Sequence, residues 1–545
     1  MTANQKKGFR YMHDLMSLWA VVLVMLLSAA ICFADCPALP APTGNTVTVD
    51  TVTEIWNAVN TAVSGDTILI ADGTYNLGAT GRYIWVDVEN VAIRSQSGNK
   101  DAVIFDDNYQ GTEVITITAS NVTIADLTIK RARTHAIHVA SSSSADTLNT
   151  LIYNVKIIDP GQQAIKINPA DGSSYFADYG EVACCTMELT EAGRVEVYNY
   201  NGSCYTGGVD GHQAKGWVVR DCTIEGFWCA LGLSEHGVHF WTGSRDTIVE
   251  RNTFINNARA VGFGMRENGT GRTYTDNPCP DATGYVGHFG GIVRNNFILA
   301  DDSSLFSSEY GADTGIALWQ SCSSHVYHNS LAFTSAPYSA VEYRFGNTQA
   351  EIKNNLTTHN ILQRDEASAT LDANLQNQAL TIFDDPVGRD LHLASTALAA
   401  IDNGVALPAG ACNEDFDEEL RPNNARDIGA DEIDPLPPGT TYSLTVTRSG
   451  DGGGTVTSSP AGIDCGSDCS QDYAVYSSVT LTAVADGNSR FLSWSGGGCS
   501  GNGSCTITMD QDHSISAQFS VRLPDEFPWH MFLPAITGSI ENQKQ

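Results

Sequence analysis

A short pattern that recurs along the middle of the chain restricts the possible folds more than any other feature. In each copy an aliphatic residue is followed two positions later by a polar residue, and three positions after that by another apolar residue. The six copies are Ile124/Asp126/Ile129, Ile152/Asn154/Ile157, Val219/Asp221/Ile224, Val249/Arg251/Phe254, Ile292/Arg294/Phe297 and Val326/His328/Leu331. Short β-rich runs repeated every few tens of residues are typical of a solenoid, in which each coil buries its inner row against its neighbours.

The same alignment suggests a ladder of side-chain amides. Asn252, Asn295 and Asn329 occupy one position of the repeat. We therefore expect their amides to stack at a turn of successive coils.

Two intervals between copies are too long for a single coil. They hold excursions at 171–210 and 267–291, and loops that leave a regular solenoid tend to form the walls of a binding groove. Cys184, Cys185, Cys204 and Cys279 lie in these excursions, so we expect disulfides to fix them.

The start of the chain predicts export. Lys6, Lys7 and Arg10 precede an apolar run from Leu18 to Ala34, which is the order of a secretory signal, and we expect cleavage after Ala34. An uncleaved signal anchor is the alternative, because the run is close to the minimum length of a membrane span. We predict a secreted or cell-surface protein whose 14 cysteines are largely paired, with Cys465–Cys469 and Cys499–Cys505 close enough to form small loops.

The charge excludes some partners. The 545 residues include 62 acidic and 30 basic side chains, for a formal net charge of −32. Such a field does not favour nucleic acid or an anionic membrane, and we predict no nucleic-acid partner. We expect a monomer.

Local patterns then divide the chain. Residues 51–63 have a helical apolar stripe, suited to capping the first coil. A proline-rich linker follows the solenoid, and short alternating strands follow the linker. The predicted parts are a signal peptide at 1–34, a linker at 35–48, the solenoid at 49–433, a linker at 434–440, a small β domain at 441–520 and a tail at 521–545, which docks on a neighbouring domain or serves as a sorting signal.

Specific motifs now identify a resemblance. The solenoid resembles right-handed parallel β-helix proteins of the pectate-lyase-like superfamily. The resemblance rests on the opening Trp56-Asn-Ala-Val with the run from Ser64 to Tyr75, on the coils above and on the closing run from Asp427 to Glu432. Residues 441–520 resemble the divergent internalin B-type repeat, through Ser493-Trp494-Ser-Gly-Gly and a trailing strand. The resemblance implies an all-β fold with an N-terminal capping helix. It does not specify the chemistry, because this fold hosts lyases, hydrolases, epimerases and adhesins.

The segment from Asp210 to Arg272 is the densest in polar residues. Its seven acidic and seven basic residues make it formally neutral, and it is therefore a comparatively positive region of an acidic chain. A sugar acid would bind best there, and we predict lyase-like β-elimination on an acidic polysaccharide. This reaction needs a group that neutralises the carboxylate and a base that removes the neighbouring proton.

Candidate residues for these roles come from that segment and from later coils. Lys215 is the predicted base and Arg266 the predicted neutralising group. The full set of predicted catalytic residues is Lys215, His212, Asp210, His236, His239 and Arg266. The predicted substrate-binding residues are Trp241, Arg245, Arg259, Arg294, Glu342 and Arg344.

Several alternatives stay open. Asp210-Gly-His212-Gln resembles the Asp-Pro-His-Asp motif of alginate epimerases of this fold, although Gly and Gln replace Pro and the second Asp. A non-catalytic adhesin or glycan-binding protein at the cell envelope is a further possibility. A glycoside hydrolase would need two carboxylates, with Asp171, Asp178, Asp210, Glu235 and Glu267 available. No cofactor is assigned, but Ca²⁺ would suit the acidic doublets Asp106-Asp107 and Asp301-Asp302.

Overall fold

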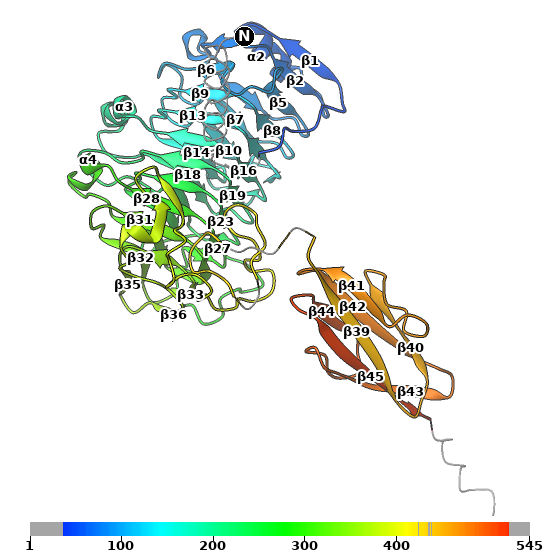
Figure 1. Cartoon of the computed structure of the whole chain (residues 1–545). Helices are drawn as coiled ribbons and strands as arrows, with labels where there is room; N and C mark the ends of the chain where they lie inside the picture. The colour runs from blue at the N-terminus through cyan, green and yellow to red at the C-terminus, as the bar shows by residue number, and fades with distance from the viewer. Residues whose placement is uncertain (1–35, 423–424, 434–436, 438, 523–545) are drawn as a thin grey trace, which may run out of the picture. The chain divides into compact units, whose positions relative to one another are not determined.

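A computed structural model describes residues 36–422, 425–433, 437 and 439–522. The predicted signal peptide and nearly all of the predicted tail lie outside these residues. Within them the chain forms two units, and the first contains the solenoid (Figure 1). No helix in the described part is both long and apolar enough to cross a membrane.

The first unit is a right-handed parallel β-helix, as predicted. The chain passes repeatedly through three sheets, which we name A, B and C, and every pair of neighbouring strands in them is parallel. Sheet C consists of β4 (Ile84–Val86), β7 (Ile115–Ile117), β10 (Ile137–Ala140), β14 (Gln163–Asn168), β18 (Gly207–His212), β21 (Val238–Trp241), β25 (Arg259–Phe263), β29 (Thr314–Trp319), β32 (Ser339–Arg344) and β35 (Ile361–Arg364).

The other two sheets complete each coil. The main strands of sheet A are β1 (Thr46–Val49), β2 (Thr67–Ile70), β5 (Ala92–Ser95), β8 (Thr123–Ala125), β12 (Leu151–Tyr153), β16 (Glu181–Ala183), β19 (Val218–Arg220), β23 (Ile248–Glu250), β27 (Ile292–Arg294), β30 (Ser321–Tyr327), β33 (Gln349–Lys353) and β36 (Ser368–Asp372), with the short β22 (Ser244–Arg245) and β26 (His288–Phe289) joining through β30. Sheet B consists of β3 (Gly73–Tyr75), β6 (Val103–Asp106), β9 (Thr128–Lys130), β13 (Lys156–Ile158), β17 (Thr186–Glu188), β20 (Thr223–Glu225), β24 (Thr253–Ile255), β28 (Phe297–Ala300), β31 (Ser330–Phe333) and β34 (Leu356–Thr357).

Smaller elements decorate the coils. They are α2 (Val52–Asn60), α3 (Glu191–Asn201), α4 (Ser303–Phe306), β11 (Thr147–Leu148) paired with β15 (Ala177–Asp178), and β37 (Phe383–Asp385) paired with β38 (Asp390–Leu393). The predicted helix is α2, which begins at the Thr51 cap and buries Ile55 and Val59 in the core at the N-terminal end of the solenoid (Figure 1).

The core consists of rows of side chains that stack in register. Ile137, Ile165 and Val209 occupy equivalent positions on consecutive strands of sheet C, and all three are fully buried. Because side chains alternate across a strand, a fixed inner row also fixes an outer row that faces solvent. The candidate site lies in the outer row of sheet C.

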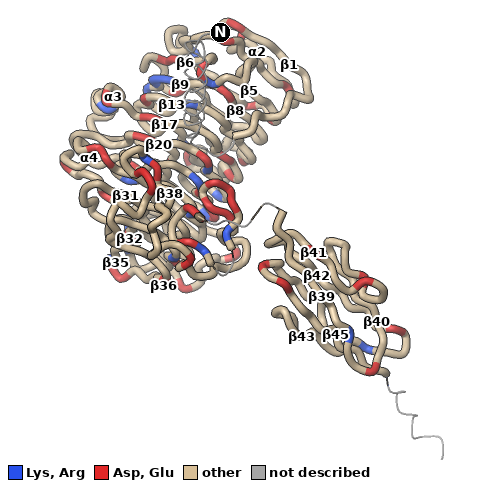
Figure 2. Tube along the Cα trace, in the orientation of Figure 1, with Lys and Arg blue, Asp and Glu red and all other residues tan. Residues whose placement is uncertain are grey.

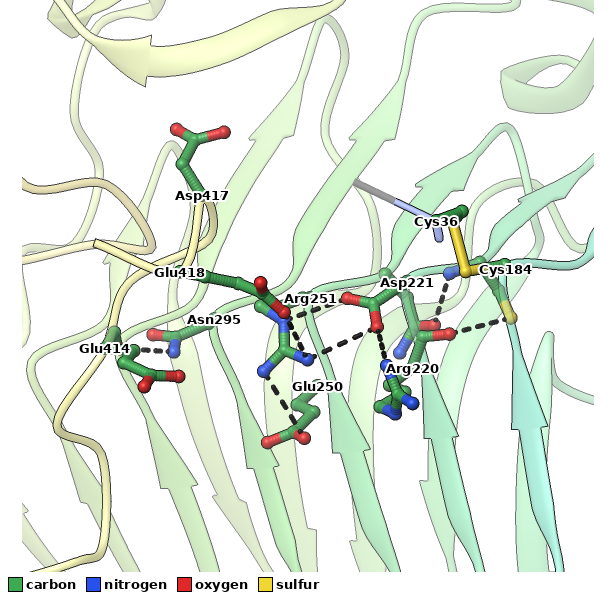
Figure 3. A network of polar contacts seen from close by, with 12 residues as sticks. Cys36, Cys184, Arg220, Asp221, Glu250, Arg251, Asn295, Glu414, Asp417 and Glu418 are labelled. Atoms are coloured by element: carbon green, nitrogen blue, oxygen red, sulfur yellow. Dashed lines mark hydrogen bonds and ion pairs between the residues drawn. A yellow bond between two sulfur atoms is a disulfide. The ribbon is translucent and has the colours of Figure 1, made fainter. Parts of the chain in front are cut away.

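The polar residue of the repeat forms the turn between sheets A and B. Asp221 and Arg251 adopt the left-handed conformation, with φ of 56° and 51°. In the next coil the left-handed residue is Asn295, with φ of 53°, and not Arg294 as the repeat predicted. Cys184, which the sequence pattern missed, is left-handed as well. Figure 3 shows this row from the side: Arg251 binds Asp221 at 2.8 Å and also pairs with Glu250 and Glu418. Side chains at these strained turns therefore bind one another along the solenoid.

The predicted amide ladder exists, but one of its members was assigned wrongly. The ladder runs through Asn252, Asn296, Asn329, Asn355 and the partly buried Asn374, each amide accepting from the one before it at 2.9–3.0 Å. Asn295 lies at the left-handed turn and donates to the carbonyl of Glu414 instead (Figure 3). The repeat was aligned one residue too early in that coil. The inward residue there is Val293, not Ile292, and Val293 pairs with Val249 and Val326.

Five disulfides are present in the described residues. Cys465–Cys469 and Cys499–Cys505 agree with the predicted small loops, and Cys204–Cys229 and Cys279–Cys322 hold excursions. The fifth joins Cys36 to Cys184, so the segment predicted as a linker at 35–48 is fixed to a later coil, and its last residues already belong to β1. Cys185, which was also expected to pair, is buried and forms no disulfide with another described cysteine, and the same holds for Cys222. Disulfides form in oxidising compartments, in agreement with an extracellular location.

The second unit contains a small antiparallel-rich β domain. One sheet has the order β41 (Ser470–Ala474), β39 (Thr441–Gly450), β45 (His513–Val521), β43 (Ser489–Ser495), and the other has the order β40 (Gly454–Ser459), β42 (Ser478–Ala485), β44 (Cys505–Thr508). Trp494 is buried in its core and donates to the carbonyl of Gly503 at 2.6 Å. Acidic side chains outnumber basic ones in both units (Figure 2).

We predict that the amide ladder is a main source of stability. Asn296→Ala removes a buried amide that bonds two neighbouring coils, and the loss should destabilise the solenoid by about 2–4 kcal/mol, because partners above and below are left unsatisfied. Thermal unfolding measures this. The control is Asn199→Ala on the exposed face of α3, which should change the unfolding midpoint little, and equal midpoints for the two variants would contradict the prediction.

Candidate functional site

The outer face of sheet C carries a row of polar side chains. Thr116, His138, Lys166, Asp210 and His239 occupy paired positions on five consecutive strands. These residues are far apart in sequence, but the stacking of coils places neighbours in the row about 4.8 Å apart.

Lys166, Asp210 and His212 form the centre of the site, which we call the Lys–Asp–His cluster. The ammonium of Lys166 donates to Oδ2 of Asp210 and lies 2.8 Å from Nε2 of His212. The same His212 nitrogen is 3.1 Å from Oδ2 of Asp210. The side chains of Lys166 and Asp210 are 9% and 4% exposed, whereas His212 is 24% exposed. His212 is therefore the member of the cluster most open to a ligand.

The cluster keeps its carboxylate ionised. Burial opposes the charge on Asp210, but Lys166, and then His212 and His239, outweigh burial and hold the pKa of Asp210 well below its usual range. Trp241 adds a hydrogen bond from its indole N–H to Oδ1 at 3.0 Å. Asp210 thus serves as a fixed negative anchor that orients Lys166.

Aromatic rings cover one side of the cluster. The Trp241 ring packs edge-on against His212, with centroids 4.6 Å apart, and stacks on His239 at 5.4 Å. The guanidinium of Arg266 lies 4.9 Å from the centre of the Trp241 ring. The structure thus brings four of the predicted catalytic residues together with Trp241, namely Asp210, His212, His239 and Arg266. The fifth, His236, packs on His239 with ring centroids 4.4 Å apart.

A groove runs beside the cluster. One hollow of about 480 Å³ is lined by Trp85, His138, Asn168 and the loop at 140–143, and a second of about 340 Å³ is lined by Asn168, His212, Gln213 and the loop at 169–173. The two hollows share Asn168, Ala170 and Asp171. The groove therefore passes His212 and has the half-exposed Trp85 ring in its outer part.

A second polar group borders this groove. Oε1 of Glu113 accepts from Nδ1 of both His135 and His138, at 3.1 and 2.8 Å, and the two histidines and Thr116 lower the pKa of Glu113 against the effect of burial. Nε2 of His138 lies 2.6 Å from Oδ1 of Asn168, whose amide N–H₂ donates to Pro169. The His138 ring is thus held between Glu113 and Asn168 at the edge of the groove.

Tyr205, which is 38% exposed, is a further ionisable group near the cluster. It precedes β18, and Lys166 and Asp210 both act on it electrostatically. Burial raises the pKa of Tyr205, so its hydroxyl keeps its proton at neutral pH.

Other predicted residues continue along sheet C. Arg259 pairs with Asp313 at 2.6 Å and lies over the Trp319 ring, and Arg344 also contacts that ring and pairs with Asp365. Oε1 of Glu342 lies 3.3 Å from Nη1 of Arg364. The predicted binding residues Arg259, Glu342 and Arg344 are thus on the same sheet as the cluster, toward the C-terminal coils.

Three predicted residues lie elsewhere. Lys215 and Arg245 form a bridge between strands at the turn toward sheet A, where the ammonium of Lys215 lies over the Tyr179 ring. Arg294 is on sheet A and pairs with Glu250. The structure therefore does not bring Lys215, the predicted base, to the Lys–Asp–His cluster.

Sequence reasoning missed Lys166, Tyr205, His138 and Trp85. The available signal was the coil repeat: Lys166 lies directly below Asp210 on the neighbouring strand. The excursion that contains α3 separates the two residues by 44 positions, so no short spacing connects them.

The sequence also offered carboxylates for hydrolysis and for calcium binding. Asp178 is bound by Arg272 and Asp210 by Lys166, so neither is an isolated acid for hydrolysis. In the predicted calcium doublets, Asp106 pairs with Arg131, Asp107 accepts from the Gly111 N–H, Asp301 binds Asn256 and Asp302 caps α4. Each of these four carboxylates thus has protein partners, and Ca²⁺ there stays a prediction.

Comparisons with known proteins agree with the predicted second domain. A family model, the divergent InlB B-repeat domain, matches residues 443–522. A search of curated proteins gave no significant match.

Solved structures with a similar course of the chain were also found. They include the pectate lyase Pel9A, with TM-score 0.41 and 14% identity over 69% of this chain and 90% of that chain. The tailspike protein of E. coli bacteriophage HK620, in complex with a pentasaccharide, has TM-score 0.39 and 14% identity over 61% and 59%. A rhamnogalacturonan lyase has TM-score 0.39 and 13% identity over 62% and 90%.

We predict that Lys166 and Asp210 depend on each other for stability. Lys166→Met leaves a buried carboxylate without its cation and should cost about 3–5 kcal/mol, whereas the double variant Lys166→Met/Asp210→Asn should recover much of this loss. Denaturant unfolding of the wild type, both single variants and the double variant measures the coupling. Lys353→Met, which breaks a more exposed pair with Glu351, should lower the free energy of unfolding by under about 1 kcal/mol. If Lys166→Met lowers it by no more than this, the predicted coupling is wrong.

Proposed function

We propose that this protein binds an acidic polysaccharide in the groove along sheet C and cleaves it by β-elimination. The observation that carries the proposal is the Lys–Asp–His cluster, in which a buried carboxylate holds a cation against an accessible imidazole beside an open groove. This arrangement supplies the two groups that the reaction needs, one that neutralises a uronate carboxylate and one that removes the neighbouring proton.

In the proposed reaction Lys166 neutralises the substrate. A uronate carboxylate that enters the groove competes with His212 for the Lys166 ammonium, which Asp210 keeps oriented. Charge on the carboxylate otherwise opposes formation of the carbanion at C5. Once Lys166 binds the carboxylate, Nε2 of His212 is left as a free proton acceptor.

His212 and Tyr205 then complete the elimination. His212 takes the proton from C5, the electron pair of that bond forms the C4=C5 double bond, and the bond from C4 to the glycosidic oxygen breaks. The Tyr205 hydroxyl, which keeps its proton at neutral pH because burial raises its pKa, protonates the leaving oxygen. The products are one new reducing end and one unsaturated uronate.

Epimerisation would use the same first step. Removal of the C5 proton by His212, followed by return of a proton from the opposite face, would invert C5 without breaking the chain. Asp210 and His212, the two residues of the epimerase-like motif, are both in the cluster, and this observation keeps epimerisation as the second candidate.

The proposal predicts that Lys166, and not Lys215, is needed for activity. His212→Ala and Lys166→Ala should each reduce the rate of unsaturated-product formation by about 10²–10⁴-fold, because the first removes the base and the second removes the group that neutralises the carboxylate. The measurement is the ultraviolet absorbance of the C4=C5 double bond with alginate, pectate and chondroitin as substrates. Lys215→Ala should keep wild-type activity, since its described contacts are with Tyr179 and the Asp178 region.

The outcomes separate the alternatives. Loss of activity in Lys215→Ala but not in Lys166→Ala would overturn the assignment. Inversion at C5 without ultraviolet absorbance would indicate an epimerase, and new reducing ends without absorbance would indicate a hydrolase. Glycan binding without any turnover would indicate an adhesin.

A second prediction concerns the groove. Trp85 is 50% exposed and lines the outer hollow, where a flat ring suits the apolar face of a sugar. Trp85→Ala should raise KM about tenfold and leave kcat nearly unchanged, because the ring lies away from the Lys–Asp–His cluster. The matched control is Tyr310→Ala, an exposed aromatic near α4 outside the groove, and a similar KM change in both variants would argue against the sugar contact.

A further inference from the structure

Four buried ligand-type atoms at the start of β21 have no hydrogen-bond partner. They are Oε2 of Glu235, both ring nitrogens of His236 and Nδ1 of His239. Buried polar atoms are nearly always paired, so a concentration of unpaired ones within three neighbouring side chains requires an explanation.

The environment of His239 determines where its proton is. Its Nε2 lies 3.1 Å from the carbonyl oxygen of Gly264, which can only accept, so Nε2 carries the hydrogen. Nδ1 is the ring nitrogen left to face the other groups. It lies 3.4 Å from Oε2 of Glu235 and 3.5 Å from Oδ1 of Asp210. Two carboxylate oxygens and one ring nitrogen thus surround one point, where a cation is favourably placed.

His236 points into the same space. Its side chain has no exposed surface, and its ring centroid is 4.4 Å from that of His239. Both of its ring nitrogens are buried and without a hydrogen-bond partner among the described residues. A glycine on the next strand makes this position possible, since a Cβ at Gly262 would lie 2.6 Å from Nε2 of His236.

We propose that Glu235, His236 and His239 bind one divalent transition-metal ion of the Zn²⁺ class. Their ligand atoms lie within 4.8 Å of one another. Metal–ligand bonds of 2.0–2.1 Å in a tetrahedral site place ligand atoms about 3.3 Å apart, close to the 3.4 Å between Nδ1 of His239 and Oε2 of Glu235. Two imidazoles with a carboxylate favour zinc and similar metals over calcium.

The surroundings fit such an ion. The hydrogen bond from Nε2 of His239 to a backbone carbonyl is the usual support for a metal-binding histidine. The nearby cation Arg259 is neutralised by Asp313 at 2.6 Å. Asp210 presents Oδ1 to this site and Oδ2 to Lys166 and His212, so one carboxylate connects the metal site to the Lys–Asp–His cluster.

Two other groups of candidate metal ligands occur in the described part of the chain, but their histidine nitrogens already have side-chain partners. In the group Glu113, His135 and His138, each histidine nitrogen has a carboxylate or amide partner. In the group around His392, both ring nitrogens contact the carboxylates of Asp390 and Asp417. Hydrogen bonds account for these histidines without an ion.

The test is metal binding by the full chain, stripped with a chelator and titrated with Zn²⁺ by calorimetry. We expect one equivalent to bind with micromolar or tighter affinity. Co²⁺ in place of Zn²⁺ should give visible absorption bands of a four-coordinate site. His239→Ala and Glu235→Gln should each weaken Zn²⁺ binding by at least about 100-fold and abolish the Co²⁺ bands.

Two controls keep the test decisive. His135→Gln alters the other histidine pair and should bind Zn²⁺ like the wild type, and circular dichroism confirms that each variant is folded. Absence of stoichiometric binding by the wild-type chain would overturn the proposal, as would binding that survives in His239→Ala or disappears in His135→Gln. The readout is metal binding itself, so the proposed β-elimination can fail or succeed independently.

Discussion

Register between parallel coils is the constraint on which the rest of the structure depends. Once Ile137, Ile165 and Val209 stack inside the solenoid, the residues between them must face outward at a spacing set by backbone hydrogen bonds. Lys166 meets Asp210, and Asp210 meets His239, because of this stacking and not because of their distance in sequence. A sheet of this kind is rigid, so the site on its outer face is preorganised before any ligand binds.

Asp210 has the central electrostatic role on that face. It is buried and ionised, and its two oxygens face different groups: Oδ2 contacts Lys166 and His212, and Oδ1 contacts Trp241 and faces His239. An ionised carboxylate in such a position is costly unless several partners compensate it. The proposed catalytic groups and the proposed metal ligands therefore share one buried charge, and a change at either would alter the field at the other.

Much of the fold could be predicted from the sequence, because the coil repeat reports the inner rows directly. The error at Asn295 shows the limit: Ile292 and Val293 are adjacent β-branched residues, and only packing against Val249 and Val326 decides which faces inward. The site was partly predictable, since Asp210, His212, His239 and Trp241 lie on neighbouring strands. Lys166 was not, because an excursion of variable length separates it from its partner, while Lys215, closer in sequence, lies past a turn.

The bond between Cys36 and Cys184 changes how the solenoid can come apart. A stack of repeats can ordinarily fray from an end, each coil detaching from the next and gaining chain entropy as it does so. Here the first described residue is covalently joined to a coil 148 positions later. Coils that detach at this end stay inside a closed loop, and the entropy they gain is smaller. The N-terminal coils are therefore expected to melt together as one block, and an end that would be open in a plain solenoid is protected from stepwise fraying.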